Sequence, residues 1–167
     1  TGISAISNAS QLMEVMTKIA IGLSLGGNII ISQYFGNKDD ENYKQATGTL
    51  FTLFTLLGIL TAVIFYTFGY HMLISMKAPA LEDAWAYLKI SSIGLFFIMC
   101  YNALSAVLRS LGNSKSPFHF ILISTVINII LDILFVGYFK LGTAGAALAT
   151  VISQGISFFL ALIYIFK

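Results

Sequence analysis

The chain of 167 residues is strongly apolar: 57% of its residues are hydrophobic and 10% are charged. A soluble domain has roughly a quarter charged residues, so the composition excludes an ordinary water-soluble globular protein. The formal net charge of +2 is small and dispersed, which excludes a nucleic-acid-binding protein with a basic surface. The single cysteine, Cys100, cannot form an internal disulfide and lies in an apolar run, where cysteine packs as a small hydrophobic residue.

Five long apolar segments predict five membrane-spanning helices, because about 20 apolar residues cross the roughly 30 Å hydrocarbon core of a bilayer. The segments 45–76 and 141–166 contain no Asp, Glu, Lys or Arg at all. We predict an all-α, polytopic transmembrane helical bundle of the cell (plasma or inner) membrane. Its predicted spans are residues 11–35, 46–71, 84–109, 117–138 and 143–166.

The first predicted span carries Glu14 and Lys18 near its start. They are four residues apart with the Glu on the amino-terminal side, a spacing that favours an ion pair on one helix face. The pair is either an ion pair at the membrane surface or a pair that lines a transport cavity, and the sequence leaves both open. The span ends at the polar segment 36–41, whose glycine and charge cluster belong in water.

Short polar breaks separate the other spans, and two of them contain a proline, Pro79 and Pro117, where a helix stops or starts. Connections this short make successive helices antiparallel, so alternate breaks lie at the same membrane surface. The basic residues at one surface are then Lys38, Lys44, Arg109, Lys115 and Lys167, against Lys77, Lys89 and Lys140 at the other. The first surface carries the larger positive charge and is predicted to be cytoplasmic.

The fourth predicted span contains Asp132 in otherwise uncharged surroundings, where an ionised carboxylate is costly unless it faces protein or water. Asn128 lies one helical turn earlier on the same face. Together they form a small oxygen-rich site for a proton or a hard cation. A carboxylate that exchanges a proton for a cation is what coupled antiport needs. The alternative is a neutral Asp132 that only holds neighbouring helices together through hydrogen bonds.

Small residues are concentrated at 22–27 and 144–149, where they allow helices in lipid to approach closely. Neither segment follows a predicted strand, so a dinucleotide-binding fingerprint is excluded. The sequence has no His-Glu-x-x-His motif, no nucleophile elbow and no metal-ligand spacing. We therefore expect no enzyme activity, no metal site and no cofactor.

Several motifs, in order along the chain, resemble the MATE (multidrug and toxic compound extrusion) family. The segment 32–39 (SQYFGNKD) resembles the end of the family's second helix, and segments 87–90 (YLKI) and 103–113 (ALSAVLRSLGN) resemble its fourth helix and the following loop. The segments 128–132 (NIILD) and 145–150 (GAALAT) resemble its fifth and sixth helices.

This resemblance implies a twelve-helix transporter of two six-helix bundles, in which residues 1–167 are helices two to six of the first bundle. It places Tyr87, Asn128, Asp132 and Thr150 in a polar network implicated in cation coupling. The family's first helix, whose acidic residue completes that network, is absent from the sequence. We therefore expect the sequence to start inside a longer chain and this segment to be inactive alone.

The functional hypothesis is a secondary antiporter that exports amphipathic, often cationic drugs in exchange for Na⁺ or H⁺. Its expected partners are the lipid bilayer, the drugs and the coupling ion, without nucleic acid, and the full-length protein is expected to be monomeric. Two alternatives are a lipid-linked saccharide flippase of the same superfamily and a non-transporting membrane scaffold. The near absence of Lys and Arg from the spans favours drugs over pyrophosphates, while Asn128 and Asp132 argue against a scaffold.

Overall fold

The computed structural model describes the backbone of residues 2–78 and 80–167, and the side chains of residue 7 and of residues 9–78 and 80–167. The described part is helical throughout and contains no strand. Its helices are α1 (Gly2–Gly36), α2 (Asp40–Ser75), α3 (Leu81–Ser110), α4 (Lys115–Asp132), a π-helical continuation η1 (Ile133–Tyr138), and α5 (Gly142–Phe166). With α4 and η1 taken as one span, 5 helices are long and apolar enough to cross a membrane. The predicted all-α bundle of five spans is confirmed.

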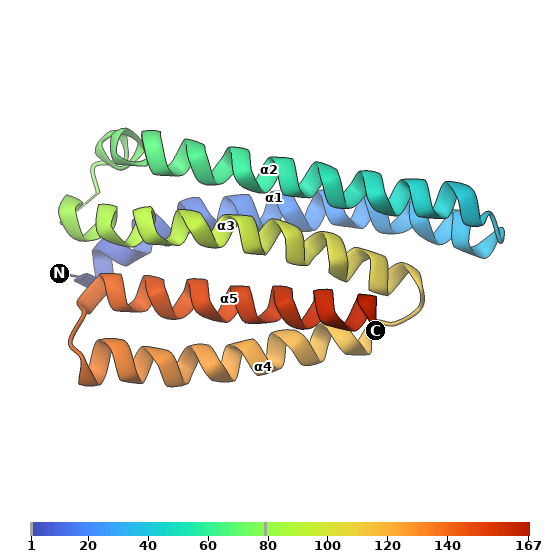
Figure 1. The fold of residues 1–167 in the computed structure, drawn as a ribbon. Coiled ribbons are helices and arrows are strands. Elements are labelled where there is room, and N and C mark those ends of the chain that lie inside the picture. The colour runs from blue at the N-terminus through green and yellow to red at the C-terminus, as the bar shows by residue number, and fades with distance from the viewer. Residues whose placement is uncertain (1, 79) are drawn as a thin grey trace.

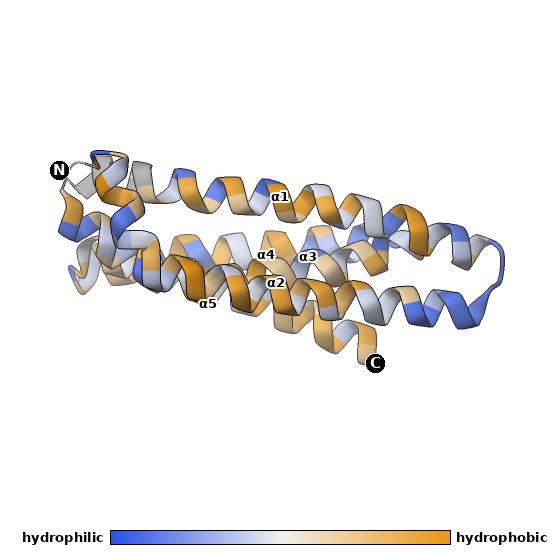
Figure 2. Cartoon of the chain, turned by 90° about the horizontal axis from the view of Figure 1, so that it is seen from above, coloured by the Kyte–Doolittle hydropathy of each residue, from blue (hydrophilic) through white to orange (hydrophobic). Residues whose placement is uncertain are grey.

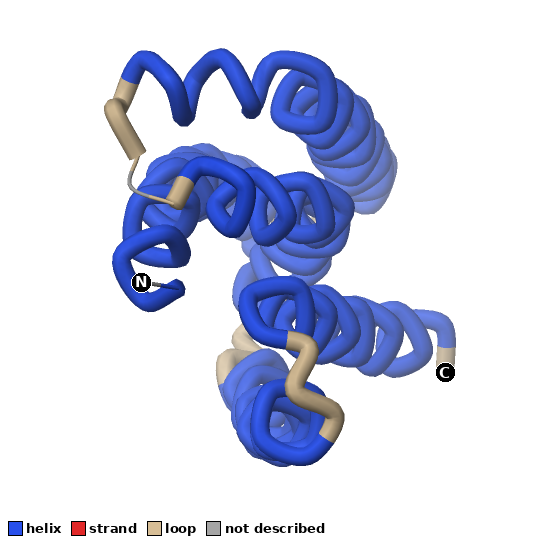
Figure 3. Tube along the Cα trace, turned by 90° about the vertical axis from the view of Figure 1, so that its left-hand side faces the viewer, coloured by secondary structure: helices blue, strands red, loops and turns tan. Residues whose placement is uncertain are grey.

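The five spans lie side by side along one long axis (Figure 1). Among the described residues, α3 contacts α1, α2, α4 and α5, whereas α4 contacts α5 and a small part of α3 but neither α1 nor α2. Seen from the end in Figure 3, the α1, α2 and α3 helices occupy the upper part of the bundle and α4 with α5 the lower part. The two parts are therefore held together mainly along α3 and α5.

The buried core is arranged around α3, because this helix has buried side chains on most of its circumference. One cluster joins Leu88 and Leu95 of α3 to Met13 of α1 and Ala147 of α5. A second joins Met99, Ala103, Ala106 and Val107 of α3 to Ile31 of α1 and to Leu50 and Phe54 of α2. Small residues allow these helices to approach closely: a Cβ on Gly58 of α2 would lie 3.2 Å from the backbone of Phe96.

All five helices begin earlier than predicted, and the first two differ most from their predicted starts. The second starts at Asp40 instead of residue 46, because Asp39 caps it: its carboxylate accepts a hydrogen bond from the backbone N–H of Asn42 at 3.2 Å. Asp40 and Glu41 then lie in the first turn, where negative charge is favourable. The first helix starts at Gly2 instead of residue 11. The prediction from apolar segments left out these polar turns, because a membrane-spanning helix can continue beyond the hydrocarbon core of the bilayer. The predicted stop at Pro79 lies outside the described residues.

The charged breaks alternate between the two ends of the bundle, as predicted. The connections after α1 and α3 lie at the same end as the carboxyl terminus, and the connection after η1 lies at the opposite end (Figure 1). Figure 2 shows hydrophilic residues gathered at the α1–α2 connection and apolar residues along the middle of the helices. The structure thus confirms which basic residues share an end, and the cytoplasmic assignment stays a prediction.

Candidate functional site

Asn128 and Asp132 lie on the side of α4 that packs against α5. Buried residues of α4 recur at helical spacing at Pro117, Phe120 and Ser124, and the half-buried Asn128 and Asp132 continue that line. Each of these two retains a buried atom without a hydrogen-bond partner, Nδ2 of Asn128 and Oδ1 of Asp132. An unpaired buried polar group costs about 1–3 kcal/mol. The carboxylate oxygen of Asp132 is therefore suited to bind a proton, water or a cation, and the amide nitrogen of Asn128 is suited to donate to water or to an oxygen.

Thr150 of α5 lies at the depth of Asp132. The antiparallel α4 and α5 meet at Phe120 and Tyr164, whose ring centroids are 5.6 Å apart. They also meet beyond Asp132, where a Cβ on Gly145 would lie 3.2 Å from the carbonyl carbon of Phe135. Interpolation between these contacts places Asp132 level with Thr150. The Thr150 hydroxyl donates to the carbonyl of Ala146 in its own helix at 2.9 Å.

Tyr87 of α3 is buried among side chains of three helices. It is 9% exposed and belongs to the cluster that contains Met13 of α1 and Ala147 of α5. Among the described residues, no hydrogen bond joins any two of Tyr87, Asn128, Asp132 and Thr150. The structure therefore brings the four predicted residues to neighbouring helices without linking them directly.

A line of polar residues on α3 extends from the predicted Tyr87, and its other members were not predicted as site residues. Its members recur at nearly whole helical turns and so share one side of the helix: Tyr87, Ser91, Asn102, Ser105 and Arg109. Arg109 donates from Nη1 to the Ser105 hydroxyl at 2.9 Å, while its Nε is buried and unpaired. The hydroxyl of Ser91 is also buried and unpaired. The helical spacing of these residues is the signal that could have found them.

Gln154 of α5 was not predicted either. Its side-chain oxygen is buried without a partner and occupies the space that a Cβ on Gly94 of α3 would need. The apolar surroundings of Gln154 in the sequence are typical of a span, and no short motif singles it out. Only the approach of α5 to a glycine on α3 reveals that its side-chain oxygen is buried.

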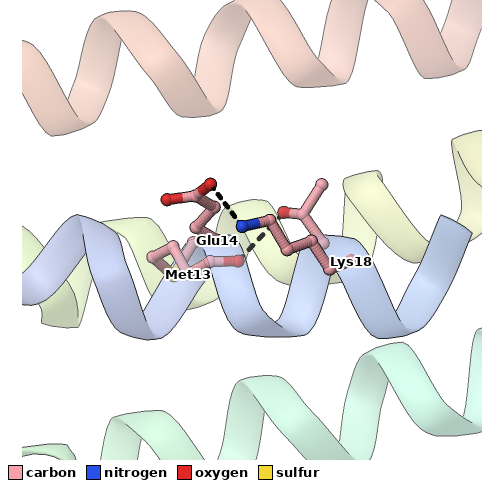
Figure 4. A network of polar contacts seen from close by, with 4 residues as sticks. Met13, Glu14 and Lys18 are labelled. Carbon is pink, nitrogen blue, oxygen red and sulfur yellow. Dashed lines mark hydrogen bonds and ion pairs between the residues drawn. The ribbon is translucent and has the colours of Figure 1, made fainter.

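Glu14 and Lys18 form the predicted ion pair, with 2.8 Å between Oε1 and Nζ. Their side chains are 61% and 71% exposed in the described structure. Figure 4 shows both projecting from α1 on the side away from α2. The pair is therefore formed within one helix, and its use at a surface or in a cavity stays open.

Residues 1–134 match the family model described as MatE. The chain belongs to the MatE family. It is 36% identical over 99% of its length to the probable multidrug resistance protein YoeA of Bacillus subtilis (strain 168), and it covers 37% of that protein. This MatE chain thus spans a little over a third of the length of that curated relative.

Solved structures agree with the family. A crystal structure of MATE in the bent conformation matches with a TM-score of 0.94 and 23% identity, covering 99% of this chain and 37% of that one. The lipid II flippase MurJ, in an inward closed conformation, matches with a TM-score of 0.67 and 23% identity, covering 99% and 36%. At these identities both likenesses concern the fold, which is closer to that of the MATE transporter.

The MatE family is one of transporters and not of enzymes. Its membership and the five apolar helices place this chain in the plasma membrane as a multi-pass protein.

Proposed function

We propose that the MatE protein containing this chain is a secondary antiporter that exports amphipathic, often cationic drugs in exchange for Na⁺ or H⁺. The observation that carries the proposal is the pair of unpaired, buried polar atoms of Asn128 and Asp132 within a membrane-spanning helix. Such groups are costly in a membrane and are typical of ion and proton pathways. The name of the Bacillus relative, a probable multidrug resistance protein, supports drugs as the substrates.

The position of Asp132 suits a conformational switch. It is the last residue of α4, and the helix continues from Ile133 as the π-helical η1. Single π-helical turns occur frequently at functional sites. An ion at Asp132 can shift an equilibrium between two transporter states only if the two states bind it with different affinity. A rearrangement of η1 directly after the carboxylate would supply such a difference.

The flippase alternative has less support. Between Ser116 and Phe139, and again between Leu141 and Phe166, there is no Lys or Arg to bind a pyrophosphate. The likeness to the flippase fold is also weaker than the likeness to the MATE fold. Drug export is therefore the proposal that the residues of α4 and α5 favour.

The test uses the full-length protein in liposomes and follows efflux of a fluorescent cationic drug under an imposed Na⁺ or pH gradient. The variant Asp132→Asn removes the exchangeable charge and is expected to lower gradient-driven efflux by about tenfold or more. Asp83→Asn is the matched control, because Asp83 lies exposed in the first turn of α3. Efflux by Asp132→Asn at the parental rate would contradict the coupling role. A folded parent without any gradient-driven efflux would instead favour the flippase.

A further inference from the structure

Two adjacent serines of α3 are equally buried but differ in their hydrogen bonding. Ser91 and Ser92 are each 1% exposed. The Ser92 hydroxyl donates to the carbonyl of Lys89 at 2.7 Å, as a serine in a spanning helix usually does, whereas the Ser91 hydroxyl has no partner. A buried hydroxyl without a partner is costly, so Ser91 retains a free hydrogen-bonding group that Ser92 has already used.

Gln154 presents a second unpaired oxygen to the same region. Ser91 and Gly94 are three residues apart and share one face of α3. The Oε1 atom of Gln154 is packed against Gly94, with Val151 of α5 beside it. The absence of a side chain at Gly94 therefore creates the space that the side-chain oxygen of Gln154 occupies between α3 and α5.

This region lies at the depth of the α4 pair. The same contacts that place Asp132 level with Thr150 place Asn128 level with Gln154. Four buried, unpaired polar atoms consequently lie at about the same depth of the bundle, on α3, α4 and α5: Ser91 Oγ, Asn128 Nδ2, Asp132 Oδ1 and Gln154 Oε1. Three of them are oxygens that can accept a hydrogen bond, and oxygen atoms are the ligands that hard cations prefer.

We propose that Ser91 and Gln154 are positioning residues of the ion site: their unpaired oxygens hold the water that surrounds the cation bound at Asn128 and Asp132. This inference rests on the proposed antiport function. A buried water molecule typically makes about three hydrogen bonds, which oxygens on α3 and α5 supply in addition to those on α4. The site thereby spans three helices, and the affinity for the ion depends on how α3 and α5 are packed.

The experiment measures the concentration of Na⁺ or H⁺ that gives half-maximal efflux by the full-length protein at saturating drug. Ser91→Ala and Gln154→Met each remove one oxygen at nearly constant volume. Each is expected to raise the half-maximal ion concentration by about three- to tenfold, the effect of losing one hydrogen bond. Ser92→Ala is the matched control and is expected to leave it unchanged. The KM for the drug is expected to stay at the parental value in all three variants.

This inference would be overturned if Ser91→Ala and Gln154→Met kept the parental ion dependence. The proposed function would still stand if Asp132→Asn lost coupling in the same experiment. A change in drug KM without a change in ion dependence would also overturn it. Where a variant does not fold, Gln154→Glu provides the second test, because it retains an oxygen and is expected to keep ion affinity at least at the parental level.

A readout independent of transport separates the two proposals. Ion binding is expected to raise the Tm of the purified parent in detergent, and this rise is expected to be smaller in Ser91→Ala and Gln154→Met than in Ser92→Ala. A parent that shows the rise but no gradient-driven efflux would refute antiport while still testing Ser91 and Gln154. Equal rises in all variants would refute their role in the ion site.

Discussion

The third and fourth helices show that hydropathy does not decide burial in this bundle. In its most apolar window, α3 is 67% buried, whereas α4, which is more apolar, is 6% buried. α3 intersperses Ser, Ala and Gly among its larger residues, while α4 is rich in isoleucine. In lipid an apolar side chain gains little by moving from acyl chains to another helix, and close packing of small residues drives association. Among the described residues, the helix with small residues on several sides is therefore more buried than the isoleucine-rich α4.

The largest expected effect compares a buried leucine of α3 with an exposed isoleucine of α4. Leu95 is 0% exposed and Ile130 is 57% exposed. We expect Leu95→Ala to lower the free energy of unfolding by about 2–5 kcal/mol, through lost packing and a cavity. Ile130→Ala leaves no cavity and should cost much less. Denaturant unfolding of the full-length protein in detergent measures both. Equal costs would show that the rest of the protein covers this face of α4.

The close approach of α2 to α3 is the next test. We expect Gly58→Leu to lower the free energy of unfolding by about 1–3 kcal/mol, because even a Cβ there would lie 3.2 Å from Phe96 and Met99. Gly48→Leu in the same helix is the control, since no atom lies within 4 Å of a Cβ at that position. A similar loss in both variants would mean that helix propensity, and not packing on α3, determines the cost.

A smaller effect is expected at the link between α3 and α4. The Tyr101 hydroxyl donates to the buried carbonyl of Pro117 at 2.7 Å. Tyr101→Phe leaves that carbonyl without its partner and should lower the free energy of unfolding by about 1–2 kcal/mol. Tyr164→Phe removes a hydroxyl that accepts from Asn113 at an exposed position, so it should cost less. A neutral Tyr101→Phe would show that this hydrogen bond does not hold α4 against α3.

The smallest effect is expected at the ion pair of α1. Because Glu14 and Lys18 are exposed and paired within one helix, Glu14→Gln should leave the Tm of the full-length protein unchanged, as is common for exposed ion pairs. Differential scanning fluorimetry in detergent measures it, with Lys18→Met as the companion variant. A clear drop in Tm for either variant would place the pair against another part of the protein.

The sequence predicted the number, order and approximate positions of the spans, because length and apolarity alone decide whether a helix can cross a bilayer. It also singled out Asn128 and Asp132, since an acidic residue in a span is rare enough to be conspicuous. It did not single out Ser91 or Gln154. Serine is common in spans, where it usually donates to its own helix, so only the missing partner of Ser91 distinguishes it from Ser92.

The sequence by itself therefore determined that this protein is a membrane-embedded α-helical bundle with an oxygen-rich position in its fourth span. The packing of the helices was needed to show that α3 is central among the described helices and that Gly94 leaves room for the side-chain oxygen of Gln154. Only the register of α5 between α3 and α4 placed Ser91, Gln154 and the α4 pair at one depth. The physical reason is that crossing a bilayer depends on each helix separately, whereas a polar site within it depends on which helix faces meet.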